Sequence, residues 1–172
     1  MPDEEKSSLA AEAAKGDAHA FAQLYSEIYK ELYYFALSNL GDEEEAADAV
    51  SDAVLDAFQG IKKLKDTRAF DKWMFTIMRA KIKKHKKHFV EQRMFDSSEE
   101  TLNSIPAEPE YAGIEIMDEL ASLSEDERTC ITLSCICGYK GEEISSITGI
   151  SHSTVRSHIS RARTKIKKLF AE

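Results

Sequence analysis

Hydroxyl and guanidinium side chains near the C-terminus stand at a spacing that suits contact with the edges of DNA bases. Val155, Ile159 and Ala162 recur at steps of three and four residues, so a helix would place them on one face. At about 100° per residue, a polar set then points the other way. Short hydroxyls let the backbone approach base edges, and arginine can pair with guanine through two hydrogen bonds. The polar set consists of Ser153, Ser157, Ser160, Arg161 and Thr164, with Arg156 on its flank.

A short helix and a glycine turn precede this segment, in the order of a helix-turn-helix. Ile144 and Ile147 give the short helix a buried stripe, and Gly149 can take the left-handed conformation that ends it. Ser151 or Ser153 can cap the following helix. In such a motif the second helix lies in the major groove of DNA. The alternative is an amphipathic helix with a solvated basic face, but here the apolar pattern and the absence of acids agree with DNA binding.

Charge is segregated along the chain, whose formal net charge is -8. Residues 59–93 hold 12 bases and 3 acids, and residues 151–172 hold 6 bases and 1 acid. The other two blocks are acidic: residues 1–58 hold 14 acids and 3 bases, and residues 94–150 hold 13 acids and 2 bases. Two basic blocks predict two nucleic-acid contact surfaces. The acidic blocks would then bind a basic protein partner or limit non-specific binding to DNA.

Composition excludes several other classes of protein. A chain of 172 residues with 42% hydrophobic residues can form one domain or two small ones. It has no apolar run of about 18 residues and no basic-then-apolar leader, so we expect no membrane insertion and a cytoplasmic location. No nucleophile–base pair, phosphate loop or metal constellation appears, which predicts a protein that is not an enzyme and needs no cofactor or metal.

Three cysteines fall close together in a probable helix. The spacing of Cys130, Cys135 and Cys137 matches no common zinc pattern. Cys130 and Cys137 share one helix face with Leu133, so we interpret the cysteines as reduced core residues. A redox or metal role is the alternative.

Helical periodicity is frequent and strand patterns are absent, so the predicted fold is all-α. Asp17 can cap a helix that runs to about Leu40, and Gly41 can close it. Asp42 and Glu45 have the spacing of a capping box for a second helix. For this acidic run, a cap with a solvated first turn is favoured over a functional surface, because acids favour helix N-termini. The apolar stripe of the second helix is predicted at Ala46, Val50, Val54, Phe58 and Ile61.

A long basic helix is predicted from about Ala69 to Arg93, after a lysine-rich loop. Trp73 lies in its apolar stripe, which favours a core role over a wedge between DNA bases. His85 and His88 have no companion carboxylate or cysteine in the sequence pattern, so we expect exposed phosphate contacts rather than a metal site.

A change of composition divides the chain into two helical units. Pro106 and Pro109 interrupt any helix between residues 95 and 111, which predicts a flexible linker. A second unit is expected to begin near Ala112. Within it, Ser124 and Glu127 have the capping-box spacing ahead of another helix. The linker could span at most roughly 60–65 Å, enough to separate two DNA contacts by more than one helical turn of about 34 Å.

Recognisable motifs occur in both halves of the chain. In the N-terminal half they are Ala20-Phe-Ala-Gln-Leu-Tyr25, Gly41-Asp-Glu-Glu-Glu-Ala-Ala-Asp-Ala-Val50 and Trp73-Met-Phe-Thr-Ile-Met-Arg79. In the C-terminal half they are Leu120-Ala-Ser-Leu-Ser-Glu-Asp-Glu-Arg128, Thr154-Val-Arg-Ser157 and Arg161-Ala-Arg163. With these motifs the chain resembles bacterial RNA polymerase sigma factors of the extracytoplasmic-function (ECF) group. The resemblance covers residues 16–170.

The resemblance implies a subunit that joins core RNA polymerase and directs promoter-specific transcription initiation under the control of an anti-sigma protein. It implies two domains, region 2 at residues 1–93 and region 4 at residues 112–172, with a linker at residues 94–111. In region 2, an acidic surface would dock on the clamp helices of the largest polymerase subunit. The residues implied for docking are Asp48, Val50, Ser51, Asp52 and Leu55.

The same resemblance implies two sites of contact with promoter DNA. A loop at residues 60–72 would read the unwound minus-ten element of the DNA. Lysine and arginine side chains on the following helix would hold the phosphates. The minus-ten and backbone set is Lys63, Lys65, Thr67, Arg68, Lys72, Arg79, Lys83, Lys86 and Lys87. The minus-thirty-five set on the last helix is Ser153, Thr154, Arg156, Ser157, Ser160, Arg161 and Arg163.

Two alternative functions remain open at this point. Ser51 and Asp52 stand where the family usually has Gln-Glu, and Ala80 and Lys84 replace an Asn and an Asp. A weakened docking motif would suit a decoy that sequesters an anti-sigma protein, although a decoy has no need of a basic recognition helix. A plain helix-turn-helix regulator would usually need a dimer, and the sequence has no heptad seam.

Overall fold

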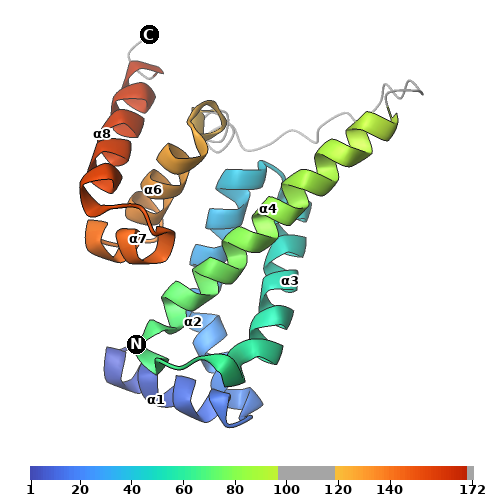
Figure 1. Ribbon diagram of the computed structural model, residues 1–172, viewed down its shortest axis with the longest axis vertical. Coiled ribbons are helices and arrows are strands. Elements are labelled where there is room, and N and C mark those ends of the chain that lie inside the picture. Colours follow the sequence, from blue (N-terminus) through green and yellow to red (C-terminus); the bar gives the residue numbers. More distant parts are fainter. Residues whose placement is uncertain (97–118, 170–172) are drawn as a thin grey trace.

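The computed structural model describes residues 1–96 and 119–169, and all of the regular structure in those residues is helical (Figure 1). This confirms the all-α prediction. The N-terminal half contains α1 (Asp3–Ala14), α2 (Ala18–Leu40), α3 (Glu43–Gly60), two short 3-10 turns (Ile61–Lys63 and Thr67–Ala69) and α4 (Phe70–Asp96). The C-terminal half contains α6 (Glu125–Cys135), α7 (Gly141–Thr148) and α8 (His152–Leu169). The predicted helix start near Ala112 and the prolines of the linker lie outside the described residues.

The boundary between α2 and α3 follows the predicted capping residues. Asp17 accepts hydrogen bonds from the backbone N–H groups of His19 and Ala20, at 2.9 and 3.1 Å. Gly41 ends α2 in the left-handed conformation with φ +72°, where a residue with a Cβ would be strained. Asp42 then accepts a hydrogen bond from Glu45 N at 2.9 Å and begins α3.

Alanines form most of the buried face of α3, together with Val50 of the predicted stripe. Ala46, Ala49, Ala53 and Ala57 are completely buried, whereas Phe58 is 47% exposed. Small side chains at a helix contact shorten the distance between helix axes. The prediction that Phe58 belongs to the core was therefore wrong, because the close approach of α3 to its neighbours turns the larger side chain outward.

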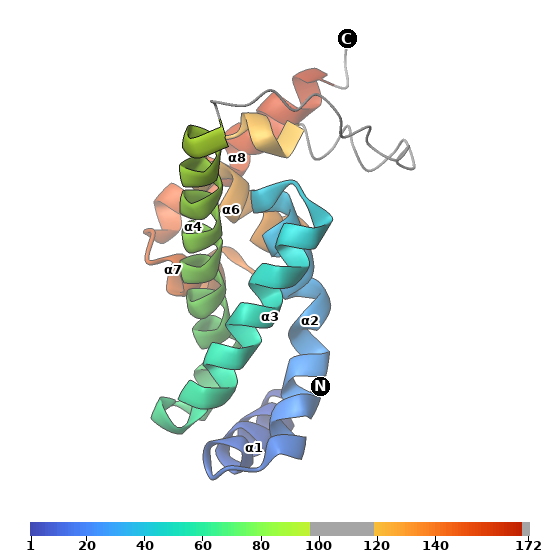
Figure 2. The ribbon, with the colours of Figure 1, turned by 90° about the vertical axis from the view of Figure 1, so that its right-hand side faces the viewer.

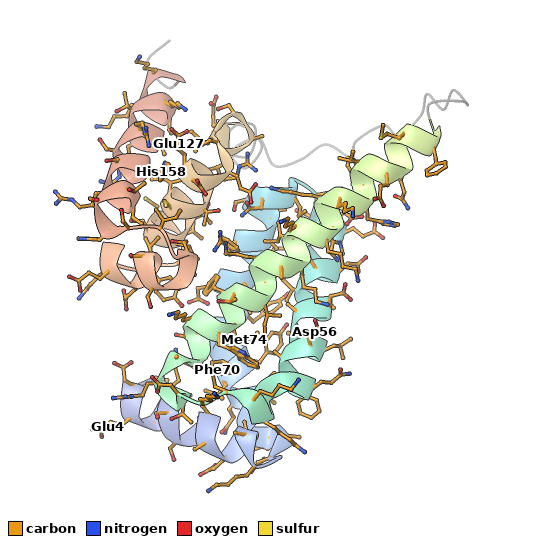
Figure 3. All side chains as sticks on the ribbon, in the orientation of Figure 1. Glu4, Asp56, Phe70, Met74, Glu127 and His158 are labelled. Carbon is orange, nitrogen blue, oxygen red and sulfur yellow. The ribbon has the colours of Figure 1, made fainter. Side chains whose placement is uncertain are left out.

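A tightly packed bundle of α2, α3 and α4 forms the N-terminal domain, and α1 crosses its lower end (Figures 1 and 2). Phe70 and Met74 of α4 are completely buried in this bundle (Figure 3). The sequence did not predict α1. It is anchored by an ion pair between Lys6 Nζ and Asp71 Oδ2 at 2.6 Å and by a 2.7 Å hydrogen bond between the hydroxyls of Ser7 and Thr67.

The C-terminal domain is a helix-turn-helix supported by α6. The predicted capping box is present at its start, because Glu127 N donates to Ser124 Oγ and Ser124 N donates to Glu127 Oε2. Gly149 ends α7 with φ +76°. Ser151 caps α8 by accepting a hydrogen bond from Thr154 N at 3.3 Å. The predicted order of helix, glycine turn and basic helix is thus correct.

The two domains pack against each other, with α6 beside α2 and α7 beside α4 (Figure 1). At the centre of the contact, the rings of Phe75 and Tyr139 meet edge to face with centroids 5.4 Å apart. Thr132 Oγ1 donates a hydrogen bond to Ser38 Oγ at 3.2 Å, and both residues are buried. The sequence predicted two domains able to work apart, and it did not predict this contact.

Candidate nucleic-acid interface

The outer face of α8 is polar along its whole described length. Val155 and Ala162 are completely buried and fix the helix on α6 and α7. Because these anchors lie on one face, the opposite face is left to solvent. A shallow hollow on that face is lined by Ser153, Arg156, Ser157, Ser160 and Arg161. The predicted minus-thirty-five residues are all exposed: Ser153, Thr154, Arg156, Ser157, Ser160, Arg161 and Arg163.

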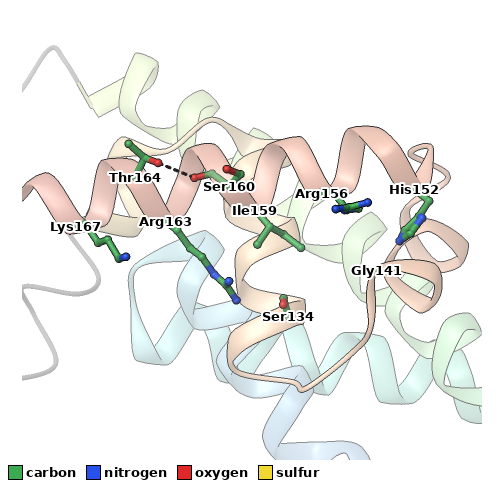
Figure 4. A pocket seen from close by; sticks show the side chains of 9 residues that line it. All are labelled: Ser134, Gly141, His152, Arg156, Ile159, Ser160, Arg163, Thr164 and Lys167. Carbon is green, nitrogen blue, oxygen red and sulfur yellow. Dashed lines mark hydrogen bonds between the residues drawn. The ribbon is translucent and has the colours of Figure 1, made fainter.

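A basic groove of about 620 Å³ runs along the flank of α8 (Figure 4). Arg156, Arg163 and Lys167 line it from α8, and Ser134 lines it from α6. These are donors of the kind that hold phosphate oxygens beside a groove of DNA. Sequence reasoning placed Arg163 in this surface but did not single out Lys167 or Ser134, which the packing of α6 on α8 brings together.

A buried carboxylate lies between α6 and α8. Only 6% of the Glu127 side chain is exposed, and Lys165 Nζ approaches its Oε2 to 2.6 Å. Arg161 Nε lies 3.7 Å from the other oxygen, Oε1. The hydrogen bond from Lys165 is the main reason that the pKa of Glu127 is lowered, and the bonds from Ser124 lower it further against the opposing effect of burial. Glu127 is therefore a charged anchor beneath α8.

The loop between α3 and α4 presents most of the predicted minus-ten residues to solvent. Lys63, Lys65, Arg68 and Lys72 are exposed. Thr67 is half-buried, since its hydroxyl bonds to α1 as described above. The groove at this loop is lined by residues of α1, the loop, α4 and α7. It includes acidic as well as basic side chains, so α1 and α7 reduce the positive charge around the loop.

The four basic side chains of α4 that were predicted to hold DNA phosphates divide into two pairs. Lys83 and Lys87 are exposed. Arg79 instead faces the C-terminal domain, where its Nη1 donates to the carbonyl oxygen of Thr148 at 3.1 Å. Lys86 also faces this domain, and the pKa of Lys86 is lowered first by burial and then by the nearby charge of Arg128. In this arrangement Arg79 is bonded to the C-terminal domain, and Lys86 is half-buried next to it.

Of the five docking residues predicted on α3, three are exposed, one is half-buried and one is buried. Asp48 and Ser51 are exposed, and Leu55 is 60% exposed. Val50 is only 2% exposed and belongs to the core, so it cannot contact a partner on this face. Asp52 is half-buried and turned toward α4.

His85 corrects another expectation. Its Nδ1 lies 2.9 Å from Glu45 Oε2 and its Nε2 lies 3.2 Å from Asp52 Oδ2, so the ring bridges α4 to two carboxylates of α3. An exposed phosphate contact was expected, but the helix packing supplies carboxylates that the linear pattern could not reveal. His88 is exposed, as expected. Within residues 1–96 and 119–169, no cluster of side chains could hold a metal ion.

The three cysteines occupy different environments, and all are free thiols. Cys130 is buried, and burial raises its pKa to about 11. Cys137 lies in the domain contact, where its Sγ is 3.8 Å from the carbonyl oxygen of Glu31. Burial, followed by the charge of Glu31, raises the pKa of Cys137 to about 12. Cys135 is exposed, so the prediction that all three are core residues was wrong for this one.

Comparisons with known proteins match both halves of the chain to one family. Residues 24–88 match the family described as Sigma-70 region 2, and residues 114–166 match Sigma-70, region 4. The ECF RNA polymerase sigma factor EcfG of Rhodopseudomonas palustris is 29% identical over 78% of this chain and 76% of its own. The ECF sigma factor SigL of Mycobacterium tuberculosis is 28% identical over 86% of each chain. The chain belongs to the ECF group of RNA polymerase sigma factors.

Solved structures of sigma factors share the arrangement of this one. CnrH, solved in complex with the cytosolic domain of CnrY, superposes with a TM-score of 0.77 at 25% identity and covers 97% of both chains. RpoE of Bartonella quintana, solved in complex with the anti-sigma factor NepR, gives a TM-score of 0.72 at 25% identity over 88% of this chain and 96% of its own.

In this sigma factor, the two family matches include the elements that carry the basic surfaces. The region 2 match spans the loop before α4, and the region 4 match contains α6 and α7 and most of α8. Among the described residues, no helix has the length and apolar character needed to cross a membrane.

Proposed function

We propose that this sigma factor binds core RNA polymerase and directs transcription from promoters that carry two separate DNA elements. The polar, acid-free outer face of α8 is the observation that most supports the proposal. Hydroxyls at Ser153, Ser157 and Ser160 permit close approach to the major groove, and Arg156 and Arg161 supply donors for base edges. In this proposal α8 reads the upstream, minus-thirty-five element.

Region 2 then reads the downstream, minus-ten element. Lys63, Lys65 and Arg68 are exposed at a loop beside the N-terminal end of α4, and Lys83 and Lys87 continue the basic surface along that helix. Lysines at such positions attract the backbone of an unwound strand without choosing its sequence. Sequence choice would come from the loop, where Thr67 can offer a hydrogen bond to an extruded base once it leaves Ser7.

The exposed face of α3 is the proposed docking site for the polymerase. Leu55 is a large apolar side chain that is 60% exposed, and Asp48 and Asp56 are exposed on the same helix. An apolar anchor ringed by charge is typical of the energetic centre of an interface. The negative rim suits a basic partner, such as the clamp helices of the largest subunit.

Control by an anti-sigma protein is proposed from the packed arrangement of the domains. In the packed form Arg79 is occupied by its hydrogen bond to region 4, and Lys86 is half-buried beside Arg128, which leaves both less available to hold phosphates. CnrH and RpoE, which were solved with CnrY and NepR, superpose with this chain across both domains. We infer that a comparable partner holds this packed form and that polymerase binding separates the domains.

Reconstituted transcription tests the proposal. The purified chain is combined with matching core polymerase and a library of genomic fragments, and the transcripts are compared with those from core alone. Initiation at a discrete set of sites is the expected result. A folded chain that captures an anti-sigma protein but not core polymerase would instead be a decoy. A chain that binds DNA as a dimer without polymerase would be a plain regulator.

A further inference from the structure

Glu127 forms a helix cap, where its charge favours the N-terminal end of α6, but its carboxylate also has charged partners outside that cap. Position N3 of a capping box is filled by Glu or Gln, because either side chain can accept the hydrogen bond from the N-cap N–H. A buried carboxylate is costly unless it is paired. Glu127 is 6% exposed, and both of its cationic partners, Lys165 and Arg161, come from α8. The negative charge therefore acts on the recognition helix.

The guanidinium of Arg161 is held on two sides. Its Nε lies 3.7 Å from Glu127 Oε1, and its Nη2 lies 3.1 Å from Nδ1 of His158. The side chain is still 57% exposed. With Nε turned toward Glu127 and one N–H of Nη2 used by His158, Nη1 and the second N–H of Nη2 remain for the pair of hydrogen bonds that arginine makes with guanine.

We propose that Glu127 is a positioning residue that orients Arg161 for reading one base pair. Lys165 Nζ lies 2.6 Å from Oε2 of the same carboxylate, and this ion pair holds the carboxylate in place against α8. An arginine that is ordered before binding loses less conformational freedom when it meets its base, and it has fewer ways to adapt to a wrong one. This inference rests on the proposed role of α8 in base recognition.

The test compares Glu127→Gln with Asp126→Asn in the full chain bound to core polymerase. Gln keeps the size and the cap but loses the charge. Asn removes one charge from the neighbouring position, and no ion pair joins Asp126 to the part of α8 that the structure describes. Transcripts are sequenced from promoters randomised across the upstream element. We expect Glu127→Gln to reduce base preference about tenfold at a single position, the same position that Arg161→Ala relaxes, and Asp126→Asn to keep the wild-type preference.

A second variant and a readout on the free protein separate positioning from a merely structural role. Glu127→Asp keeps the charge and should retain part of the preference that Glu127→Gln loses. The Nε–Hε NMR signal of Arg161 should shift in Glu127→Gln and stay in place in Asp126→Asn. If Glu127→Gln keeps the wild-type base preference, the inference is overturned. A stronger base preference in Glu127→Gln would also overturn it, because Glu127 would then compete with DNA for Arg161. If the wild-type chain selects no sequence, the proposed function falls and this inference falls with it.

Discussion

Replacing Arg79 with alanine should loosen the contact between regions 2 and 4. Arg79 Nη1 donates to the carbonyl of Thr148, the last residue of α7, which has no partner within its own helix. Hydrogen bonds from charged donors contribute about 1.5–3 kcal/mol, and the lower end applies because Arg79 is only half-buried. A loss of about 1.5 kcal/mol shifts the equilibrium between packed and separated domains about tenfold.

Cys137 reports this equilibrium without any added label. Its raised pKa of about 12 in the packed form means that hardly any of the thiol is ionised at pH 8, against about 25% for an ordinary thiol of pKa about 8.5. Since thiolates are the reactive form, alkylation of Cys137 should proceed through the separated form. We expect Arg79→Ala to raise its alkylation rate about tenfold, with Cys135 fast and unchanged in both proteins.

Iodoacetamide labelling with quenching and peptide mass spectrometry measures both rates in one sample. Lys83→Ala is the matched control, because it removes a charge from the same helix at an exposed position away from the contact. The reasoning is refuted if Cys137 of the wild-type chain reacts as fast as Cys135. It is also refuted if Arg79→Ala leaves the Cys137 rate unchanged while its circular dichroism shows a folded protein.

Four substitutions test the two DNA surfaces, the docking face and the core. Arg161→Ala should relax base preference at one position at a cost of about 1–3 kcal/mol, whereas Lys83→Ala should weaken binding to all sequences and lower the salt slope by about one unit. Duplex titrations at several salt concentrations measure both effects. Leu55→Asp should abolish core polymerase binding in a pull-down with no loss of stability, because the side chain is 60% exposed. Phe75→Ala should lower the free energy of unfolding by about 3–5 kcal/mol in a urea titration, since this ring is completely buried.

Each of these outcomes has a contrary result that would count against its premise. Equal losses on all sequences for Arg161→Ala and Lys83→Ala would remove the distinction between base reading and phosphate binding. Polymerase capture by Leu55→Asp at wild-type level would move the docking face away from α3. A loss below about 1 kcal/mol for Phe75→Ala would mean that the core adjusts around the missing ring.

Local signals in the sequence were enough to predict most helix boundaries. Asp17, Asp42 and Ser124 each supply a side-chain acceptor at a helix start, and Gly41 and Gly149 each supply the left-handed residue at a helix end. These interactions span two to four residues, so they can be predicted from the sequence without knowledge of the fold. The polar face of α8 could be predicted in the same way, because the buried apolar residues on the opposite face repeat with the period of a helix.

Features that depend on contacts between distant residues could not be predicted. The helix α1 was missed because it buries little more than Ala10 and Ala13, which give a weak apolar period. The pairing of His85 with Glu45 and Asp52 requires α4 to lie on α3. The capture of Glu127 by α8 likewise requires a contact 38 residues away along the chain.

Prediction of the domain contact failed for a related reason. The contact residues Ser38, Phe75, Thr132 and Tyr139 belong to two domains that each look self-sufficient in sequence. Segregated charge divided the sequence into basic and acidic blocks. The charge pattern does not show which surfaces face each other. The hydrogen bond from Arg79 to the C-terminal domain could therefore be found only in the structure.

The claim that one chain reads two separated promoter elements is tested most directly by mapping transcript starts on spacer variants. Core polymerase with this sigma factor transcribes a selected promoter, its version with about 5 extra base pairs between the elements, and its version with about 10. Half a helical turn moves the upstream element to the opposite face of the duplex. We predict that initiation from the mapped start site falls sharply with 5 added base pairs and partly returns with 10. Equal initiation from all three, or from a promoter whose upstream element is scrambled, would contradict the account.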